Sequence, residues 1–215
     1  MKKNYNVHIT VYLVISLVLC GCKKNLPQHT EVYRTDFSQG KGDLLVFAGD
    51  QVDETIGTIA FNNTKILGPL NHNAVYKYIE NLPTHKLIKI TFDLYIHDEW
   101  KGNDGLASDF WGLFIDQQRV FYTTFSNLPD REQSYPEQEG YYFPSGSNSF
   151  RKDMPGLCSL KNEKYGSSVY QFIWIRPHTN NQISLALSDL VRETDICQKS
   201  WSIDNLVISC INFDD

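Results

Sequence analysis

The sequence predicts an all-β protein: an antiparallel β-sandwich of the jelly-roll type whose first and last strands lie side by side. Residues 87–97 alternate apolar and polar side chains, which is the period of a strand with one buried face. Many short runs of this kind follow one another, separated by turn residues such as Asn62-Asn63. An apolar period of 3.6 is almost nowhere present, so helices are not expected.

The first 21 residues have the three-part form of a secretory signal. Two lysines precede an apolar stretch at residues 11–19, which is too short to span a bilayer comfortably. The segment "LCGC" that follows resembles the bacterial lipoprotein box, in which a cysteine after a small residue receives lipid. This predicts lipidation at Cys22, the alternative being a plain secreted protein cleaved nearby. Residues 22–31 are polar and are predicted to be a tether.

The charge and length of the remaining chain limit its partners. Removing residues 1–21 takes away two lysines and no acids, so the net charge changes from −5 to −7. Phosphate binding needs a basic face, which argues against nucleic acid. Residues 32–215 suit a single all-β domain and contain no apolar run long enough to span a membrane. We therefore expect a protein of the bacterial cell envelope, at the outer membrane or cell surface, that contacts the membrane only through its lipid.

The strands are predicted in a simple order along residues 32–215. They lie within residues 35–40, 54–70 (a hairpin turning at Asn62-Asn63), 87–97, 112–125 (a hairpin turning at residues 116–118), 168–179, 181–190 and 200–213. Residues 34–38 are expected beside residues 203–209, because pairing of terminal strands hides edges that would otherwise invite aggregation.

The cysteines suggest one disulfide. Cys210 lies in the apolar run "LVISCI" and is predicted to be a buried thiol. Cys158 and Cys197 lie in loop-like surroundings and are the preferred pair for an exported protein. Spacing alone does not determine connectivity.

Residues 126–166 form a long connection rich in Pro, Gly, Ser and charged residues. A connection of this length inside a compact domain is usually functional or disordered. Five aromatic rings between residues 135 and 150 favour function, since disordered segments are poor in aromatics.

Several phrases within residues 66–209 resemble an uncharacterised family of secreted all-β modules of extracellular and surface proteins. The phrases are "ILGPL", "SDFWGLFID", "TTFSN", "QSYP" and "KSWSIDNLVIS". The last is also similar to the closing strand of MAM and laminin-G sandwiches, whose first strand pairs with the last. The resemblance covers about two-thirds of the chain and implies a fold and an extracellular setting, but no reaction. Lys101 stands where the family usually has aspartate, which weakens any inherited argument for a metal.

The acid-rich segment at residues 97–116 is a candidate calcium site. Its acids do not have the spacing of an EF-hand, but calcium in β-sandwiches is often held by carboxylates and carbonyls from separate loops. Asp98, Asp104 and Asp109 are the predicted side-chain ligands. The alternative is that Asp104 belongs to a simple turn and that Asp98 caps one.

Four aromatic residues are candidates for ligand contact: Trp100, Tyr135, Tyr141 and Tyr142. Flat rings bind the C–H faces of sugars, and nearby acids and amides bind their hydroxyls. Tyrosine also suits protein recognition, because it offers a large area at low entropy cost. The alternatives are that Trp100 fills the rim of the core and that the long loop is a lid over one face.

No nucleophile elbow, Walker loop or Rossmann fingerprint occurs in the chain. His72, His85 and His178 each lie beside a turn and lack the spacing of a zinc helix. The sequence therefore favours a non-catalytic binding module for a glycan or a surface protein. The alternatives are a small jelly-roll glycoside hydrolase or lyase, whose paired carboxylates a sequence does not reveal, and a structural envelope or adhesion component.

Overall fold

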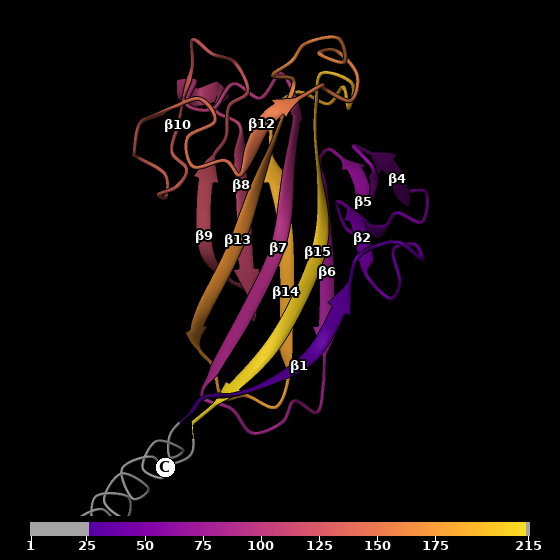
Figure 1. Cartoon of the computed structure of the whole chain (residues 1–215), viewed down its shortest axis with the longest axis vertical. Helices are drawn as coiled ribbons and strands as arrows, with labels where there is room; N and C mark the ends of the chain where they lie inside the picture. The colour runs from indigo at the N-terminus through magenta and orange to yellow at the C-terminus, as the bar shows by residue number, and fades with distance from the viewer. Residues whose placement is uncertain (1–25, 214–215) are drawn as a thin grey trace, which may run out of the picture.

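The computed structural model describes residues 26–213 (Figure 1). Two antiparallel sheets enclose a common core, which confirms the predicted β-sandwich. The predicted signal peptide and the predicted lipidation site Cys22 lie outside the described residues. Within residues 26–213, no helix is long and apolar enough to cross a membrane.

The larger sheet is built around one long strand at the C-terminal end of the chain. In spatial order it contains β12 (Arg151–Met154), β13 (Ser167–Pro177), β7 (Leu87–Asp98), β15 (Lys199–Asn212), β5 (Thr64–Leu70) and β4 (Thr58–Phe61), and β1 (Gln28–Thr35) also pairs with β15. β1 and β5 share the same edge of β15: β1 pairs with residues 206–212 and β5 with residues 201–203. A bulge after Asp204, where Asn205 has a φ of 53°, separates the two.

The smaller sheet forms the second layer. In spatial order it contains β3 (Gln51–Val52), β2 (Leu45–Ala48), β6 (Asn73–Ile79), β14 (Ile183–Leu190), β8 (Phe110–Ile115) and β9 (Gln118–Thr124). Two short strands, β10 (Glu132–Gln133) and β11 (Phe143–Pro144), form a separate hairpin-like pair, and Gly105–Ala107 form a single 3₁₀ turn.

Turn chemistry produces the two predicted hairpins. β4 and β5 join through Asn62 and Asn63, whose φ angles are 47° and 69°. β8 and β9 join through Asp116 and Gln117, with φ angles of 50° and 64°. A pair of residues with positive φ is the requirement of a tight hairpin turn, and Asn and Asp tolerate it well.

The core lies between the sheets and is rich in aromatic rings. Ile88, Ile90, Phe92 and the following apolar residues of β7 point inward, as their alternation predicts. Phe92 packs on Phe172 and Trp111, with ring centroids 4.9 and 5.9 Å apart. Burial of so many large side chains is the main favourable term for the fold.

The first strand lies earlier in the chain than predicted: it ends at Thr35, and residues 36–40, expected to be strand, form a bend and a turn. β1 starts at Gln28, so residues 28–31 are part of the sheet and not of the predicted tether at 22–31. Thr35 lies opposite Leu206 and Arg34 opposite Val207, which confirms the predicted pairing of the first and last strands. The first four residues of β1 are exposed to water, so they are polar although they belong to the sheet. No apolar run therefore marks the start of the strand in the sequence.

The long connection at 126–166 is more ordered than its composition suggests. It contains β10, β11 and β12, and β12 extends the larger sheet as an edge strand. These strands are only two to four residues long, so most of the connection consists of turns, in which proline and glycine are common.

Candidate ligand-binding site at the loop end

The acid-rich turn and the long connection meet at one end of the sandwich, as the sequence predicts. This end, here called the loop end, lies at the top of Figure 1 and is formed by residues 98–110, 126–166 and 191–198. The amide of Asn103 donates to the carbonyl of Tyr141 over 2.9 Å. The guanidinium of Arg131 pairs with Asp104 at 2.9 Å. These contacts tie the acid-rich turn directly to the loop that carries the tyrosines.

Asp109 is a buried structural anion. Both of its carboxylate oxygens lie 2.7 Å from the ammonium of Lys199, and one also accepts from the backbone N–H of Lys101. Asp109 is fully buried and the Lys199 side chain is 5% exposed. Burial raises the pKa of Asp109, and Lys199 acts in the opposite direction. The carboxylate is thus neutralised by Lys199, a partner that no local sequence pattern indicates.

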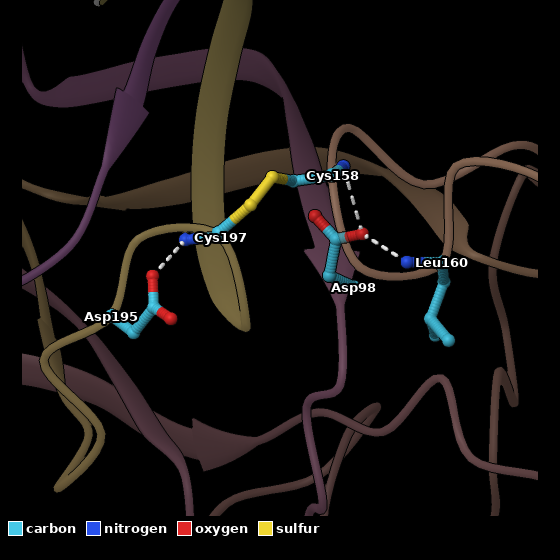
Figure 2. Close-up of a disulfide and its surroundings, with 5 residues drawn as sticks. All are labelled: Asp98, Cys158, Leu160, Asp195 and Cys197. Carbon is cyan, nitrogen blue, oxygen red and sulfur yellow. Dashed lines mark hydrogen bonds between the residues drawn. A yellow bond between two sulfur atoms is a disulfide. The ribbon is translucent and has the colours of Figure 1, made fainter.

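Asp98 organises the loop that carries the disulfide (Figure 2). Its Oδ1 accepts from the backbone N–H groups of Cys158 and Leu160, at 3.1 and 2.9 Å. Burial raises the pKa of Asp98, and these N–H groups oppose the change. Its φ of 64° ends β7 and turns the carboxylate toward this loop. The turn-capping alternative therefore describes the contacts of Asp98.

The three predicted calcium ligands have separate partners in this structure. Asp104 pairs with Arg131 at the surface, Asp109 with buried Lys199, and Asp98 with backbone N–H groups. Among residues 26–213, no group of three or more His, Cys, Asp or Glu side chains gathers in a way that would hold a metal ion. Calcium binding at this turn stays a prediction.

Trp100 and Tyr135 belong to the core. Trp100 is 0% exposed and its indole N–H donates to the carbonyl of Ser200 over 2.9 Å. Tyr135 is 7% exposed and packs among other rings, 4.9 Å from Tyr170 and 5.0 Å from Phe125. This burial corrects the prediction that the two rings contact a ligand, because it leaves them no face toward solvent.

Tyr141 and Tyr142 are exposed at the loop end. Their exposed fractions are 53% and 67%. The ring of Tyr141 is parallel to that of Phe143, with centroids 6.4 Å apart. The backbone carbonyl of Tyr141 accepts a hydrogen bond from the hydroxyl of Ser134. A fixed backbone below two exposed rings presents them to solvent at little cost in entropy on binding.

A pocket of about 640 Å³ lies in the long connection, lined by residues on both sides of the two tyrosines in the chain. Its lining is mainly apolar and includes Leu128, Pro129, Pro144, Leu160 and the half-exposed ring of Tyr165. Lys152, Glu163, Asn127, Ser145 and Ser168 add polar groups. Tyr165 and Glu163 are not among the residues that the sequence predicts to contact a ligand. Their signal in the sequence is only an aromatic residue and an acid at the end of the long connection, beside Gly166.

The disulfide holds one wall of this pocket. Cys158 and Cys197, the preferred pair from sequence, are joined with Cα atoms 5.0 Å apart (Figure 2). The bond ties the segment that bears Leu160 and Glu163 to the loop before β15. Gly156 fits against Asp98 only because it has no side chain, since a Cβ there would collide with the carboxylate. Cys210 is a buried free thiol.

No protein-family model matches the chain, and no curated protein matches it. Among solved structures, dimeric latent PorU from Porphyromonas gingivalis is 12% identical with a TM-score of 0.38; the similarity covers 65% of this chain and 10% of PorU. A family 35 carbohydrate-binding module from Clostridium thermocellum is 6% identical with a TM-score of 0.36, covering 84% of this chain and 97% of the module.

A family GH115 4-O-methyl-alpha-glucuronidase is 10% identical with a TM-score of 0.32, covering 83% of this chain and 17% of the enzyme. The chain therefore spans about a tenth of PorU and about a sixth of the glucuronidase. The TM-scores are all below 0.5, so these similarities assign neither a family nor a function.

Proposed function

We propose that this chain is a lipid-anchored, non-catalytic binding module of the bacterial cell envelope and that its ligand is carbohydrate. The observation that carries the proposal is the loop-end pocket of about 640 Å³, which combines the exposed ring of Tyr165 with Lys152 and Glu163. A sugar presents apolar C–H faces and polar hydroxyls, and a pocket with an apolar lining and a few polar groups complements both.

The position of the pocket supports the proposed anchoring. β1 begins at the opposite end of the sandwich from the loop end (Figure 1). A lipid on Cys22 would place the membrane at the end where β1 begins, so the pocket and the exposed tyrosines would point away from it.

Glu163 is the one carboxylate among the described residues that line the pocket. Hydrolysis of a glycosidic bond by the common mechanisms uses two carboxyl groups on either side of the scissile bond. The lining thus favours binding over the alternative of a small glycoside hydrolase or lyase.

A glycan array with the purified protein, followed by calorimetry on the best ligand, tests this function. Tyr165→Ala and Glu163→Gln should each weaken binding about tenfold, or about 1.4 kcal/mol, without changing the melting temperature. Tyr78→Ala, which removes an exposed tyrosine from β6 in the smaller sheet, is the matched control and should bind normally.

The competing functions predict different results. Release of new reducing ends or unsaturated sugars from any polysaccharide would identify an enzyme and overturn the proposal. Binding of a surface protein that competes with no glycan and is unaffected by Tyr165→Ala would assign the loop end to protein recognition or adhesion.

A further inference from the structure

Two buried histidines lie at the end of the sandwich opposite the loop end. His85 lies in the segment between β6 and β7, and His178 follows directly after β13. Their exposed fractions are 4% and 7%. Asp116, in the turn between β8 and β9, completes the group. Three segments that are distant in the sequence therefore meet at these side chains.

The three side chains form one linear chain of hydrogen bonds. Nδ1 of His85 lies 2.6 Å from the carbonyl oxygen of Pro83, and its Nε2 lies 2.6 Å from Nδ1 of His178. Nε2 of His178 lies 3.1 Å from Oδ2 of Asp116. The other oxygen of Asp116 accepts from the backbone N–H of Ser184 over 3.0 Å. All four ring nitrogens are thus engaged.

The number of protons in this chain follows from its ends. The Pro83 carbonyl and an ionised Asp116 carboxylate accept hydrogen bonds and donate none. Three contacts lie between these two acceptors, and each contact needs one proton. Two neutral imidazole rings supply only two, so one contact would place two acceptors face to face. A third proton on the pair satisfies every contact, whereas a fourth would oppose two N–H groups at 2.6 Å.

The charged groups around His178 act in both directions. Burial is the largest effect and lowers the pKa of His178, the charges of His85 and Arg176 lower it further, and the carboxylate of Asp116 opposes them without reversing the direction. A proton on the pair must therefore be held by the hydrogen-bond chain against the cost of burial. The two rings share a hydrogen bond, so their protonation belongs to the pair and not to either residue. A pocket of about 330 Å³, lined in part by Asp116, Arg176 and His178, gives protons a route from solvent.

We propose that His85 and His178 form a buried site that binds one proton for the pair and rejects a second, with Asp116 as its counter-charge. The bound proton closes the hydrogen-bond chain and so joins the segment before β7, the β8–β9 turn and the segment after β13. This site is separate from the proposed glycan pocket and does not depend on it.

The sign of the pH dependence follows from proton binding. The proposed site needs its third proton to complete the three contacts, so the folded pair would hold that proton more tightly than an unfolded histidine does. Its stabilisation would then be fully present below the unfolded pKa of about 6.5. It is lost as the pH rises through the apparent pKa of the folded pair. Acceptors then face each other in one contact, and the three segments at this end should become more mobile.

Nitrogen NMR of histidine-labelled protein counts these protons directly, because protonated and bare ring nitrogens differ widely in chemical shift. At pH 7.5 an ordinary histidine is about nine-tenths neutral and carries one N–H. The His85–His178 pair should carry three N–H groups there and should lose one at higher pH. A count of two N–H groups at pH 7.5 would overturn the proposal, and this measurement needs no variant.

Asp116→Asn changes the count without changing the shape of the side chain. The new amide group donates to Nε2 of His178, and its oxygen still accepts from Ser184, so two neutral rings then satisfy every contact. The pair should hold two protons at pH 7.5, and its apparent pKa should fall by at least about one pH unit. Asp130→Asn, an exposed carboxyl at the loop end, is the control and should leave the count at three. An unchanged pKa in Asp116→Asn would contradict the role of the carboxylate.

Discussion

His97 bridges three strands of the larger sheet through its two ring nitrogens. Nδ1 lies 2.9 Å from the hydroxyl of Ser167 on β13, and Nε2 lies 3.2 Å from that of Ser202 on β15. The ring is fully buried, with Phe61 edge-on at 4.9 Å. Burial without a counter-charge lowers the pKa of His97 to about 3.

This histidine should make folding sensitive to acid. Its folded pKa lies below the unfolded value of 6.5, so its contribution to stability is present above pH 6.5 and is lost as the pH falls toward 3. When the pH is lowered from 7.5 to 5, proton uptake by this histidine in the unfolded state should lower the free energy of unfolding by about 2 kcal/mol. His97→Gln keeps a polar group near both serines but removes the titration, so its loss over this interval should be about 2 kcal/mol smaller.

Urea denaturation at the two pH values measures this difference. The carboxyl groups titrate in both proteins, so their effect cancels in the comparison. His29→Gln, on the exposed part of β1, is the control and should behave as the wild type does. Equal losses in wild type and His97→Gln would show that the buried ring is not the acid-sensitive group.

At the scale of elements, the disulfide and Asp98 act on the same loop. Cys158 is bonded to Cys197, and its backbone N–H donates to Asp98. The bridge closes a loop of 39 residues that includes β13 and β14. Constraint of the unfolded chain by a loop of this length stabilises a fold by about 4 kcal/mol in the entropic account.

Replacing the bridge by two serines should affect both stability and ligand binding. Cys158→Ser with Cys197→Ser should lower the unfolding free energy by about 2–4 kcal/mol. Because the freed segment bears Leu160 and Glu163, carbohydrate affinity should fall as well, by a larger factor than in Glu163→Gln alone. Lys161→Ala, an exposed change in the same segment, is the control. A double variant with full stability and full affinity would show that the loop holds its place without the bridge.

At the scale of the whole molecule, the sequence predicts those strands and turns that depend on contacts between neighbouring residues. The alternation of β7 and the Asn62-Asn63 and Asp116-Gln117 turns are properties of neighbouring residues, so those elements could be predicted. β6 could not, because Lys77 occupies an inward position and breaks the apolar period. Its ammonium pairs with Asp43 and lies over the ring of Tyr33, contacts that depend on distant segments.

The site residues divide in the same way. The convergence of the acid-rich turn with the tyrosine loop follows from strand order and was predicted. The Lys199 partner of Asp109 is 90 positions away in the sequence. His97 occupies a polar position in the alternation of residues 87–97, which predicts exposure to water, but Phe61 from the β4–β5 hairpin packs edge-on against its ring. Neither contact leaves a trace in the local pattern of side chains.

β1 covers the edge of β15 and so keeps that edge from pairing with another chain. Deleting residues 26–35 removes β1 and bares the edge of β15 at residues 206–212. Unpaired strand edges pair readily with other chains, so the truncated protein should melt at lower temperature and associate in size-exclusion chromatography. Deletion of residues 26 and 27 alone is the control and should leave a stable protein of unchanged size, whereas a monomeric, stable truncation at residue 35 would show that β1 is dispensable.

The pairing of β1 with β15 also decides how the module would carry mechanical load. β1 begins at the end opposite the pocket and runs toward it, antiparallel to β15 over seven residue pairs. Tension between Gln28 and a ligand held at the loop end would act along β1, in shear. Its hydrogen bonds to β15 would then share the force at the same time, whereas tension across the strand would break them one after another. A tethered module of this geometry would hold its ligand against flow through the collective strength of that ladder.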